Sequence, residues 1–282
     1  MTLDLRGRWV LVTGASAGLG EAIARELAGR GAKLVLVARR ADRLRELAHE
    51  LPTECAVIAA DLALPGAAER VFAEATRGRQ IHAVVLDAAR YWFGAFAAMP
   101  AAELDAMLAL NVRANVALVH RFLPHLDAAG AGGILVVASI GGLLPSPRQS
   151  LYSATKALLV ALVQNLAYER RGSPVVLSVV APGGMLTEML TASGVLAPLR
   201  RNPLIMRSMM SPERVAREAL DGFVRGELLA IPGLANRLLF AVARLLPRRL
   251  VGWGAAEVYA TTARMPDDVV GYASENPEAR SF

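Results

Sequence analysis

A tyrosine and a lysine lie four residues apart in the segment Tyr152-x-x-x-Lys156. On a helix this spacing puts both side chains on one face, about one turn apart. A free phenol has a pKa of about 10 and is a poor acid at neutral pH, but a fixed ammonium nearby lowers that pKa. The pair therefore predicts a proton-transfer site, in which Lys156 tunes Tyr152 and also donates hydrogen bonds to the hydroxyl groups of a ligand.

Two other polar residues precede this pair along the chain. Ser139 ends a predicted buried strand thirteen residues before Tyr152, and Asn111 lies in the predicted long helix before that strand. Lys156 is one of only two lysines in a chain that otherwise uses arginine. A Tyr-x-x-x-Lys pair alone is a common accident on helices, so the prediction depends on these neighbours and on a glycine-rich turn near the amino terminus.

The glycine-rich turn follows the apolar run 9–12 and precedes a helical pattern. Such a turn brings backbone N–H groups and a helix N-terminus against a pyrophosphate, where any Cβ would obstruct the approach. An ordinary glycine-rich turn is the alternative, but the order of strand, turn and helix favours a dinucleotide site. The candidate cofactor contacts in this turn are Gly14, Ser16, Ala17, Gly18, Leu19 and Gly20.

The second predicted strand ends at Arg39 and Arg40. An acidic residue at this strand end binds the ribose 2′-hydroxyl of NAD, whereas arginine accommodates the 2′-phosphate of NADP. We therefore expect NADP(H) to be preferred over NAD(H), with Arg39 as the first candidate and Arg40 as the second. The alternative is that both are solvated residues at a helix start. Asp61 and Leu62, after the third predicted strand, either face the adenine or cap the next helix.

Together these motifs resemble those of the classical short-chain dehydrogenase/reductase family, over roughly residues 5–235. The matching pieces are the glycine turn, Asn111, Ser139, Tyr152-x-x-x-Lys156 and Pro182-Gly183-x-x-x-Thr187. The resemblance implies that Tyr152 is the general acid/base, that Ser139 hydrogen-bonds the substrate carbonyl oxygen and that Asn111 holds a water in a proton relay. It also implies that Lys156 binds the nicotinamide ribose and lowers the tyrosine pKa, while Pro182, Gly183 and Thr187 face the nicotinamide.

One stretch departs from the family pattern, because this chain has Asp87-Ala88-Ala89-Arg90 where most members have Asn-Asn-Ala-Gly. Ala88, which remains a candidate cofactor contact, lacks the amide that the usual asparagine uses to hold neighbouring backbone. Arg90 puts a long cation where a glycine normally lets the cofactor ribose pass. We expect a shifted cofactor, or an Arg90 side chain that turns toward solvent or substrate or pairs with Asp87. Cofactor affinity would weaken while the chemistry is retained.

Short apolar runs alternate with longer amphipathic stretches, which predicts right-handed βαβ units. The expected fold class is α/β, a single doubly wound parallel sheet of Rossmann type with about seven strands and helices on both faces. The predicted strands are 9–12, 34–38, 56–59, 83–86, 134–138, 175–180 and 228–231. We expect one domain over 1–235, which includes a substrate loop at 185–211, with 236–282 as a helical extension of the same domain.

Composition excludes several classes of protein. Hydrophobic residues make up 54% of the 282 residues, which excludes intrinsic disorder. The net charge of +6 comes from scattered arginines, so we expect no nucleic-acid partner. Cys55 is the single cysteine and the four histidines lack ligand spacing, so we expect no disulfide and no metal. The amino terminus lacks a signal-peptide core, and the uncharged stretch 128–147 contains glycines and prolines, so we expect a cytoplasmic protein without a membrane span.

The segments that border the predicted site are apolar. Five of the nine methionines (185, 189, 206, 209 and 210) lie in the segment 185–211. Thioether side chains repack easily around irregular ligands, although they serve equally well to pack a loop on the core. Together with the aromatic residues after Arg90, they predict a small hydrophobic carbonyl compound or alcohol as the substrate. The candidate substrate contacts are Arg90, Trp92, Gln149, Met185 and Met189.

The stretch 234–246 predicts an amphipathic helix on which Arg237 and Arg244 share one face. Such a helix packs on the core or on a partner subunit more often than it binds a membrane, so peripheral membrane contact through 234–250 stays the less frequent alternative. The family resemblance implies a homodimer or homotetramer.

The leading hypothesis is an NADP(H)-dependent oxidoreductase that interconverts a hydrophobic ketone and its secondary alcohol, with Tyr152 as general acid/base. A catalytically weak or inactive NADP-binding sensor or scaffold is the alternative. The altered stretch 87–90 favours this alternative, whereas the intact set of Asn111, Ser139, Tyr152 and Lys156 opposes it. A sugar-nucleotide epimerase or dehydratase is a third hypothesis, but such relatives have a larger carboxyl-terminal substrate domain.

Overall fold

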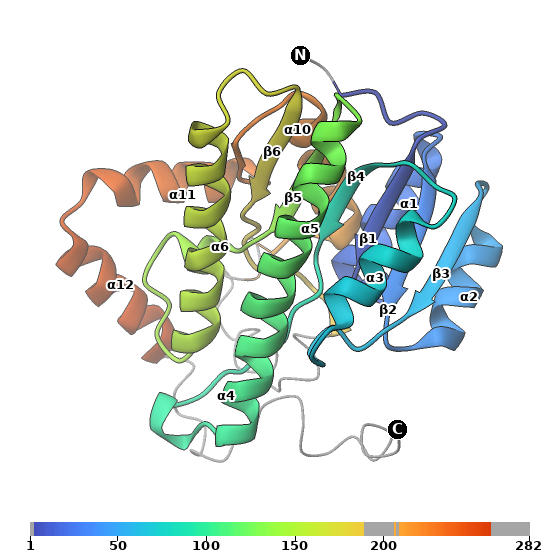
Figure 1. The fold of residues 1–282 in the computed structure, drawn as a ribbon. Coiled ribbons are helices and arrows are strands. Elements are labelled where there is room, and N and C mark those ends of the chain that lie inside the picture. The colour runs from blue at the N-terminus through green and yellow to red at the C-terminus, as the bar shows by residue number, and fades with distance from the viewer. Residues whose placement is uncertain (1–2, 189–205, 207–208, 261–282) are drawn as a thin grey trace.

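The computed structural model describes residues 3–188, 206 and 209–260 (Figure 1). Within them, seven parallel strands form one sheet in the order β3-β2-β1-β4-β5-β6-β7. The strands are β1 (Trp9–Thr13), β2 (Lys33–Ala38), β3 (Cys55–Ala59), β4 (Ile81–Leu86), β5 (Gly132–Val137), β6 (Val175–Val180) and β7 (Leu229–Ala230). The strand order reverses between β1 and β4, and doubly wound sheets bind their ligands at the carboxyl ends of the strands at such a point. The predicted α/β fold is confirmed.

Helices cover both faces of the sheet, which explains why its strands are continuously apolar. In β1, Val10 and Val12 belong to the hydrophobic core on one side and Leu11 to the core on the other. The helices α1 (Gly18–Gly29), α2 (Ala41–Glu50) and α10 (Pro212–Val224) bury side chains in the first core. The helices α3 (Ala67–Thr76), α5 (Asn115–Ala128) and α6 (Ser150–Glu169) cover the second core, in front of the sheet in Figure 1.

The helix before β5 is widened where Asn111 lies. Helix α4 (Ala101–Met107) continues through a π-helical segment, Leu108–Ala114, into α5. The widened turns are supported by the Asn115 amide, whose Nδ2 donates to the carbonyl oxygens of Leu110 at 3.0 Å and Asn111 at 3.1 Å. The sequence predicted one long helix here, and the π-helical turn is an addition that often accompanies functional sites.

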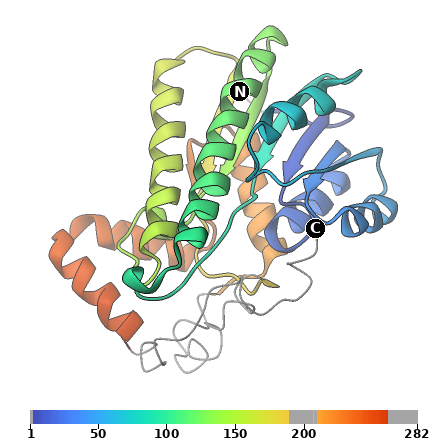
Figure 2. The ribbon, with the colours of Figure 1, turned by 60° about the horizontal axis from the view of Figure 1, so that its bottom comes forward.

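Two helices at the carboxyl-terminal end form an arm beside α6. Helix α11 (Leu234–Leu245) agrees with the helix predicted at 234–246, and α12 (Arg248–Ala260) follows after Pro247 (Figures 1 and 2). The predicted helical extension over 236–282 specified one helix, at 234–246, and α12 is a second helix that was not named there. We call α11 and α12 together the C-terminal arm.

Some predicted features differ from the structure or are only partly described by it. Strand β7 has two residues, although the apolar run predicted four. The predicted substrate loop 185–211 is described only at 185–188, 206 and 209–211, where Met185 forms a parallel bridge with Met210. None of the described helices combines the length and the hydropathy that a membrane crossing requires.

Candidate active site

A cavity of about 360 Å³ opens at the carboxyl ends of β1, β2, β4 and β5. Three of the four predicted catalytic residues, Ser139, Tyr152 and Lys156, lie on its wall. Every predicted cofactor contact except Gly20 also lines it: Gly14, Ser16, Ala17, Gly18, Leu19, Arg39, Arg40, Asp61, Leu62, Ala88, Pro182, Gly183 and Thr187. The fold therefore brings together residues that are spread over most of the sequence.

The glycine turn leaves room for a ligand that must approach the backbone. Gly14 and Gly18 have φ angles of +74° and +60°, which favour glycine. A Cβ at Gly20 would lie 2.4 Å from the carbonyl oxygen of Gly14, so Gly20 lets α1 begin directly against the turn. A Cβ at Gly18 would point at the methyl group of Thr187, 3.6 Å away. The turn and the start of α1 thus form a cradle with the geometry that a pyrophosphate requires.

Thr13 holds the altered stretch 87–90 against the glycine turn. Its Oγ1 accepts hydrogen bonds from the backbone N–H groups of Asp87 at 3.1 Å and Ala88 at 3.2 Å. The threonine hydroxyl therefore joins the ends of β1 and β4 although Ala88 has no amide side chain. Thr13 was not among the predicted site residues, and its position directly after the first predicted strand was the available signal.

The two arginines after β2 have different surroundings. The Arg40 Nη2 donates to the Ser16 carbonyl oxygen at 3.1 Å, and the guanidinium lies 3.6 Å from the Glu188 carboxylate. Arg39 is exposed at the cavity and makes no ion pair or hydrogen bond with the described residues. Arg40 therefore supports the glycine turn, whereas the Arg39 guanidinium is available to an anionic ligand.

Asp61 and Leu62 line the cavity on the far side of β2 from the glycine turn. The Asp61 Oδ1 accepts a hydrogen bond from the backbone N–H of Ala63 at 2.9 Å. Leu62 is buried in the second core. Of the two roles that the sequence left open, the local capping contact is present, and the cavity position leaves Asp61 facing the ligand space as well.

Arg90 is paired with an acid that the sequence analysis did not name. Its Nε and Nη2 donate to the two carboxylate oxygens of Glu103, in α4, at 2.7 and 2.6 Å. This bidentate geometry, with two parallel hydrogen bonds, is the strongest form of an arginine–carboxylate ion pair. Arg90 still borders the cavity, but the pairing with Glu103 fixes its long side chain.

Asn111 is buried, and its side chain hydrogen-bonds the backbone of Arg90 and the side chain of Thr155. Its Oδ1 accepts from the Arg90 N–H at 2.7 Å, while its Nδ2 donates to the Arg90 carbonyl oxygen at 2.8 Å and to the Thr155 hydroxyl at 3.2 Å. The Asn111 side chain thus ties the altered stretch to α6, which carries Tyr152. Asn111 does not lie on the cavity wall, and its role in holding a water stays a prediction.

The structure brings Tyr152, Lys156 and Ser139 together. Lys156 is 2% exposed, its Nζ donates to the Val137 carbonyl oxygen at 2.7 Å and lies 5.7 Å from the centre of the Tyr152 ring. The Ser139 hydroxyl hydrogen-bonds the Tyr152 phenol and accepts the Gly141 N–H at 3.1 Å. The end of β5 thus supplies the serine, and the first turns of α6 supply the phenol and the ammonium.

The electrostatics of this group correct the expectation that Lys156 lowers the pKa of Tyr152. Burial raises the pKa of the Tyr152 phenol, the Asp87 carboxylate raises it further, and only the Ser139 hydrogen bond lowers it. Burial also lowers the pKa of Lys156 to about 8, against the influence of Asp87. Burial and the Asp87 carboxylate therefore outweigh the Ser139 hydrogen bond, and Tyr152 is a neutral phenol at neutral pH.

Asp87 is the charged residue of the site that the sequence analysis did not assign. Asp87 is partly accessible from the cavity, yet desolvation raises its pKa to about 6, against the opposing influence of Lys156 and the Gly20 N–H. The signal in the sequence was the carboxylate that replaces the first asparagine of the family pattern. Its charge acts on both the phenol and the ammonium.

The substitution Asp87→Asn should stabilise the protein more at pH 8 than at pH 4. A folded-state pKa raised from 3.8 to about 6 contributes stability below about pH 4, which is lost as pH rises through 6. The neutral amide of asparagine still accepts a hydrogen bond from the Gly20 N–H and does not titrate. Above pH 6 the variant therefore avoids a loss of stability of about 1–3 kcal/mol that the carboxylate causes. Thermal unfolding of both proteins at the two pH values measures the difference. Asp42→Asn, on the exposed side of α2, is the control, and a pH-independent gain for Asp87→Asn would contradict the assignment.

Aromatic side chains form the wall next to Tyr152. The Tyr91 ring meets the Tyr152 ring edge-on with centres 5.0 Å apart, and Phe93 lies 6.1 Å from Tyr259 of α12. The Tyr259 hydroxyl accepts a hydrogen bond from the Gln149 Nε2 at 2.9 Å. The C-terminal arm therefore contributes a phenol beside the site, which the sequence analysis missed because Tyr259 lies 110 residues from Gln149.

The predicted substrate contacts fall into several groups. Met185 and Arg90 border the cavity, while Gln149 binds Tyr259. Trp92 is buried, with its ring packed over Gly94. Met189 lies outside the described residues.

Two further methionines of the predicted substrate loop, Met209 and Met210, differ in what they pack against. Met209 packs on the aromatic cluster, which fits a cover over the site. Met210 is buried in the first core, where its sulfur lies 3.7 Å from the Asn236 Nδ2, so it packs the core instead.

Residues 8–194 match the family model for short chain dehydrogenases. The 7beta-hydroxysteroid dehydrogenase of Collinsella aerofaciens is 31% identical over 235 residues, which are 82% of this chain and 88% of that enzyme. A structure solved in a study of 7beta-hydroxysteroid dehydrogenase stereoselectivity has a TM-score of 0.80 at 28% identity, over 91% of this chain and all of that one. A short-chain dehydrogenase from Sphingobium yanoikuyae in complex with NADPH has a TM-score of 0.74 at 31% identity, over 84% and 93% of the two chains.

Proposed function

We propose that this chain, which belongs to the short-chain dehydrogenase/reductase family, uses NADP(H) to interconvert a hydrophobic ketone and its secondary alcohol. Membership makes the protein an oxidoreductase that acts on CH–OH groups with a nicotinamide cofactor. The substrate class, the preference for NADP(H) and the roles of single residues are our inference from the site.

The observation that carries the proposal is the group formed by Ser139, Tyr152 and Lys156 on the wall of the cavity. A general acid must lie within hydrogen-bond reach of the atom that receives its proton. A serine hydroxyl and a phenol that share a hydrogen bond can both reach one carbonyl oxygen. A protein that only senses a dinucleotide has no need of this group, so its presence favours the enzyme over the scaffold.

The remaining walls of the cavity fit a dinucleotide. Gly14, Gly18 and the start of α1 would hold the pyrophosphate in the cradle described above. One N–H of the Lys156 ammonium donates a hydrogen bond to the Val137 carbonyl oxygen, and the other two N–H groups are available to the ribose hydroxyls. When bound, the cofactor gives or takes the hydride at the carbonyl carbon.

Tyr152 supplies the proton. In ketone reduction the neutral phenol donates to the carbonyl oxygen, while the Ser139 hydroxyl donates a hydrogen bond to the same oxygen. Because the pKa of Tyr152 is raised, the phenol is protonated throughout the neutral range. Alcohol oxidation needs the phenolate instead, so the geometry and the charges favour reduction at neutral pH and oxidation at higher pH.

The preference for NADP(H) is assigned to Arg39. Its exposed guanidinium stands at the carboxyl end of β2, where the 2′-position of an adenosine ribose is bound in doubly wound folds. A guanidinium there attracts a phosphate strongly.

The substrate is assigned to the class of bulky apolar ketones. Tyr91, Phe93 and Met209 form an apolar cluster that includes the Tyr152 ring, so a hydrophobic body beside the carbonyl group would be desolvated there. The similarity to 7beta-hydroxysteroid dehydrogenases supports a substrate with a rigid, fused-ring skeleton.

The purified protein should oxidise NADPH in the presence of steroid or aryl ketones of this class and much more slowly with short, polar ketones. Loss of NADPH absorbance over a graded series of ketones, run at pH 7, measures this preference. Consumption only with small polar ketones, or with none of the series, would contradict the proposed substrate class.

A further inference from the structure

The C-terminal arm exposes large apolar side chains along its whole length. Leu245 is 85% exposed and Trp253 is 70% exposed. The complete set is Leu234, Leu238, Leu239, Val242, Leu245, Leu246, Leu250, Trp253 and Val258. Contiguous apolar surface of this kind is uncommon on a free protein surface and marks an interaction site.

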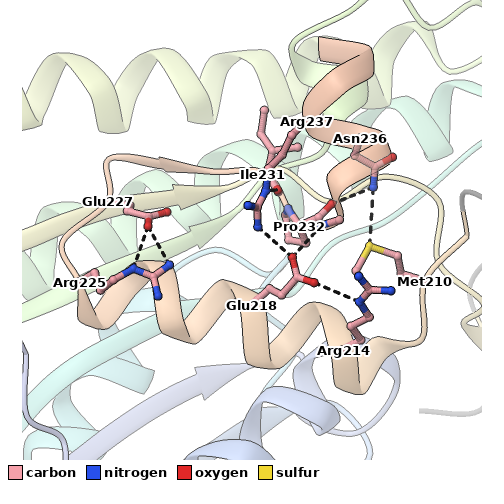
Figure 3. Close-up of polar contacts among 10 residues, drawn as sticks. Met210, Arg214, Glu218, Arg225, Glu227, Ile231, Pro232, Asn236 and Arg237 are labelled. Carbon is pink, nitrogen blue, oxygen red and sulfur yellow. Dashed lines mark hydrogen bonds and ion pairs between the residues drawn. The ribbon is translucent and has the colours of Figure 1, made fainter. Parts of the chain in front are cut away.

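The base of the arm is fixed to the body of the protein. In Figure 3, Glu218 of α10 binds Arg237, whose Nη2 lies 3.1 Å from the carboxylate. Asn236 is 5% exposed, and its Nδ2 donates to the Pro232 carbonyl oxygen at 2.8 Å. The first turn of α11 is therefore held in a defined direction by the buried Asn236 and by the Arg237–Glu218 ion pair at the surface.

The far end of the arm is also fixed. Tyr259, near the end of α12, accepts the hydrogen bond from Gln149 and packs on Phe93. Between these two anchors α11 and α12 run along the outside of the body beside α6 (Figures 1 and 2), and the apolar side chains named above are exposed. Their exposure thus belongs to a segment that is held at both ends.

The charge of the arm is predominantly positive. Residues 234–260 carry four arginines and a single acidic residue, Glu257. Arg237 pairs with Glu218, but Arg244, Arg248 and Arg249 form no ion pair within the described part of the chain. Exposed apolar residues flanked by arginines, with an exposed tryptophan among them, complement the anionic headgroups and the acyl boundary of a bilayer.

The geometry of α11 fits a helix that lies on a surface. Leu234, Leu238 and Leu245 recur at spacings of four and seven residues and so share one side of the helix, whereas Arg237 and Arg244 share a neighbouring side. The twelve residues of α11 are about 18 Å long, well short of the roughly 30 Å hydrocarbon core of a bilayer.

We propose that the C-terminal arm docks this protein on an anionic lipid bilayer. The exposed leucines, Val242 and Trp253 enter the boundary between headgroups and acyl chains, and Arg244, Arg248 and Arg249 bind the lipid phosphates. A second copy of the chain would cover the same apolar side chains, but it offers no reason for three arginines that form no ion pair with the described residues. The proposal is independent of the catalytic assignment.

Sedimentation of the full-length protein with vesicles tests this docking. Vesicles that contain phosphatidylglycerol in phosphatidylcholine should bind the protein, and pure phosphatidylcholine vesicles should bind about tenfold less or not at all. The triple variant Arg244→Glu/Arg248→Glu/Arg249→Glu should lose about tenfold or more of the binding to the anionic vesicles. The matched control Arg43→Glu/Arg45→Glu/Arg77→Glu makes the same change of net charge on exposed residues elsewhere and should bind nearly as the parent does.

The apolar part of the surface has its own readouts. Leu245→Ser should weaken vesicle binding, whereas Leu64→Ser, at an exposed leucine near α3, should not. Tryptophan emission should shift to the blue on addition of anionic vesicles. The shift should vanish in Trp253→Phe, since Trp92 is buried and Trp9, at the start of β1, lies against Lys33 and Arg79 and not on the arm.

Three results would overturn the proposal. The first is no binding to the anionic vesicles. The second is equal loss of binding in the arm variant and its charge-matched control. The third is an arm that is covered by a second copy of the chain. In that case the wild-type protein would not bind vesicles and would sediment as a dimer, whereas Leu245→Ser would sediment as a monomer.

Discussion

Tyr152→Phe should lower the turnover of an apolar ketone by about 10³-fold or more, within the range by which a positioned general acid accelerates a reaction. The substitution removes only the hydroxyl. The ring can keep its edge contact with Tyr91 at 5.0 Å and its place beside the Lys156 ammonium at 5.7 Å. The affinity for NADPH should therefore change by less than about twofold, because the glycine turn and Arg39 are untouched.

Steady-state kinetics and a binding titration on the same preparations separate these two effects. Tyr168→Phe, at an exposed tyrosine of the same helix, is the matched control and should retain full turnover. If the Tyr152 variant keeps more than about a tenth of the turnover, the proton comes from another group and the assignment of Tyr152 is wrong. A loss of NADPH binding together with turnover would instead show a disturbed fold.

Arg39→Asp should reverse the cofactor preference. The variant loses a charge-assisted hydrogen bond to the 2′-phosphate, worth about 1.5–3 kcal/mol, and gains a carboxylate that repels the phosphate and accepts from the 2′-hydroxyl of NAD. The ratio of the dissociation constants for NADH and NADPH should fall by roughly 30-fold or more. Titration calorimetry with both cofactors measures this ratio.

Arg40 provides the comparison for Arg39. Because Arg40 donates to the Ser16 carbonyl oxygen and pairs with Glu188, Arg40→Ala should weaken NADPH and NADH binding alike through the glycine turn. Arg43→Asp, at an exposed position of α2, should change neither constant. An unaltered ratio in Arg39→Asp would refute the assignment, and a changed ratio only in the Arg40 variant would move it to Arg40.

The sheet and the glycine turn were predictable because their causes are local. Strands buried on both faces are continuous apolar runs, and each predicted run overlaps one of the strands. Gly14, Gly18 and Gly20 are required by close approaches within one turn, which a short stretch of sequence displays. The order of strand, turn and helix then indicated a dinucleotide site at the end of the first strand.

The features that escaped prediction depend on distant partners. The π-helical turn at Asn111 is supported by the Asn115 amide, and nothing in the local pattern separates that turn from an α-helix. The Arg90–Glu103 pair joins a loop to α4, and Tyr259 reaches Gln149 from the far end of the chain.

The electrostatics could not be foreseen for a related reason. The spacing of Tyr152 and Lys156 indicated a lowered phenol pKa, but the sign of the shift depends on the depth of burial and on Asp87. Burial is a property of the folded environment, so Ser139, Tyr152 and Lys156 could be grouped from the sequence, whereas the protonation of Tyr152 and Lys156 could not be predicted.

The most direct test of the account is a fluorescence titration of the wild-type protein with NADPH and, separately, with NADH. The cavity should bind NADPH more tightly than NADH by about tenfold or more, which corresponds to about 1.4 kcal/mol. Equal affinities would contradict the role of Arg39. Binding of neither cofactor would show that Asp87, Ala88 and Arg90 have closed the dinucleotide site, and the account of the protein as an NADP(H)-dependent reductase would fail.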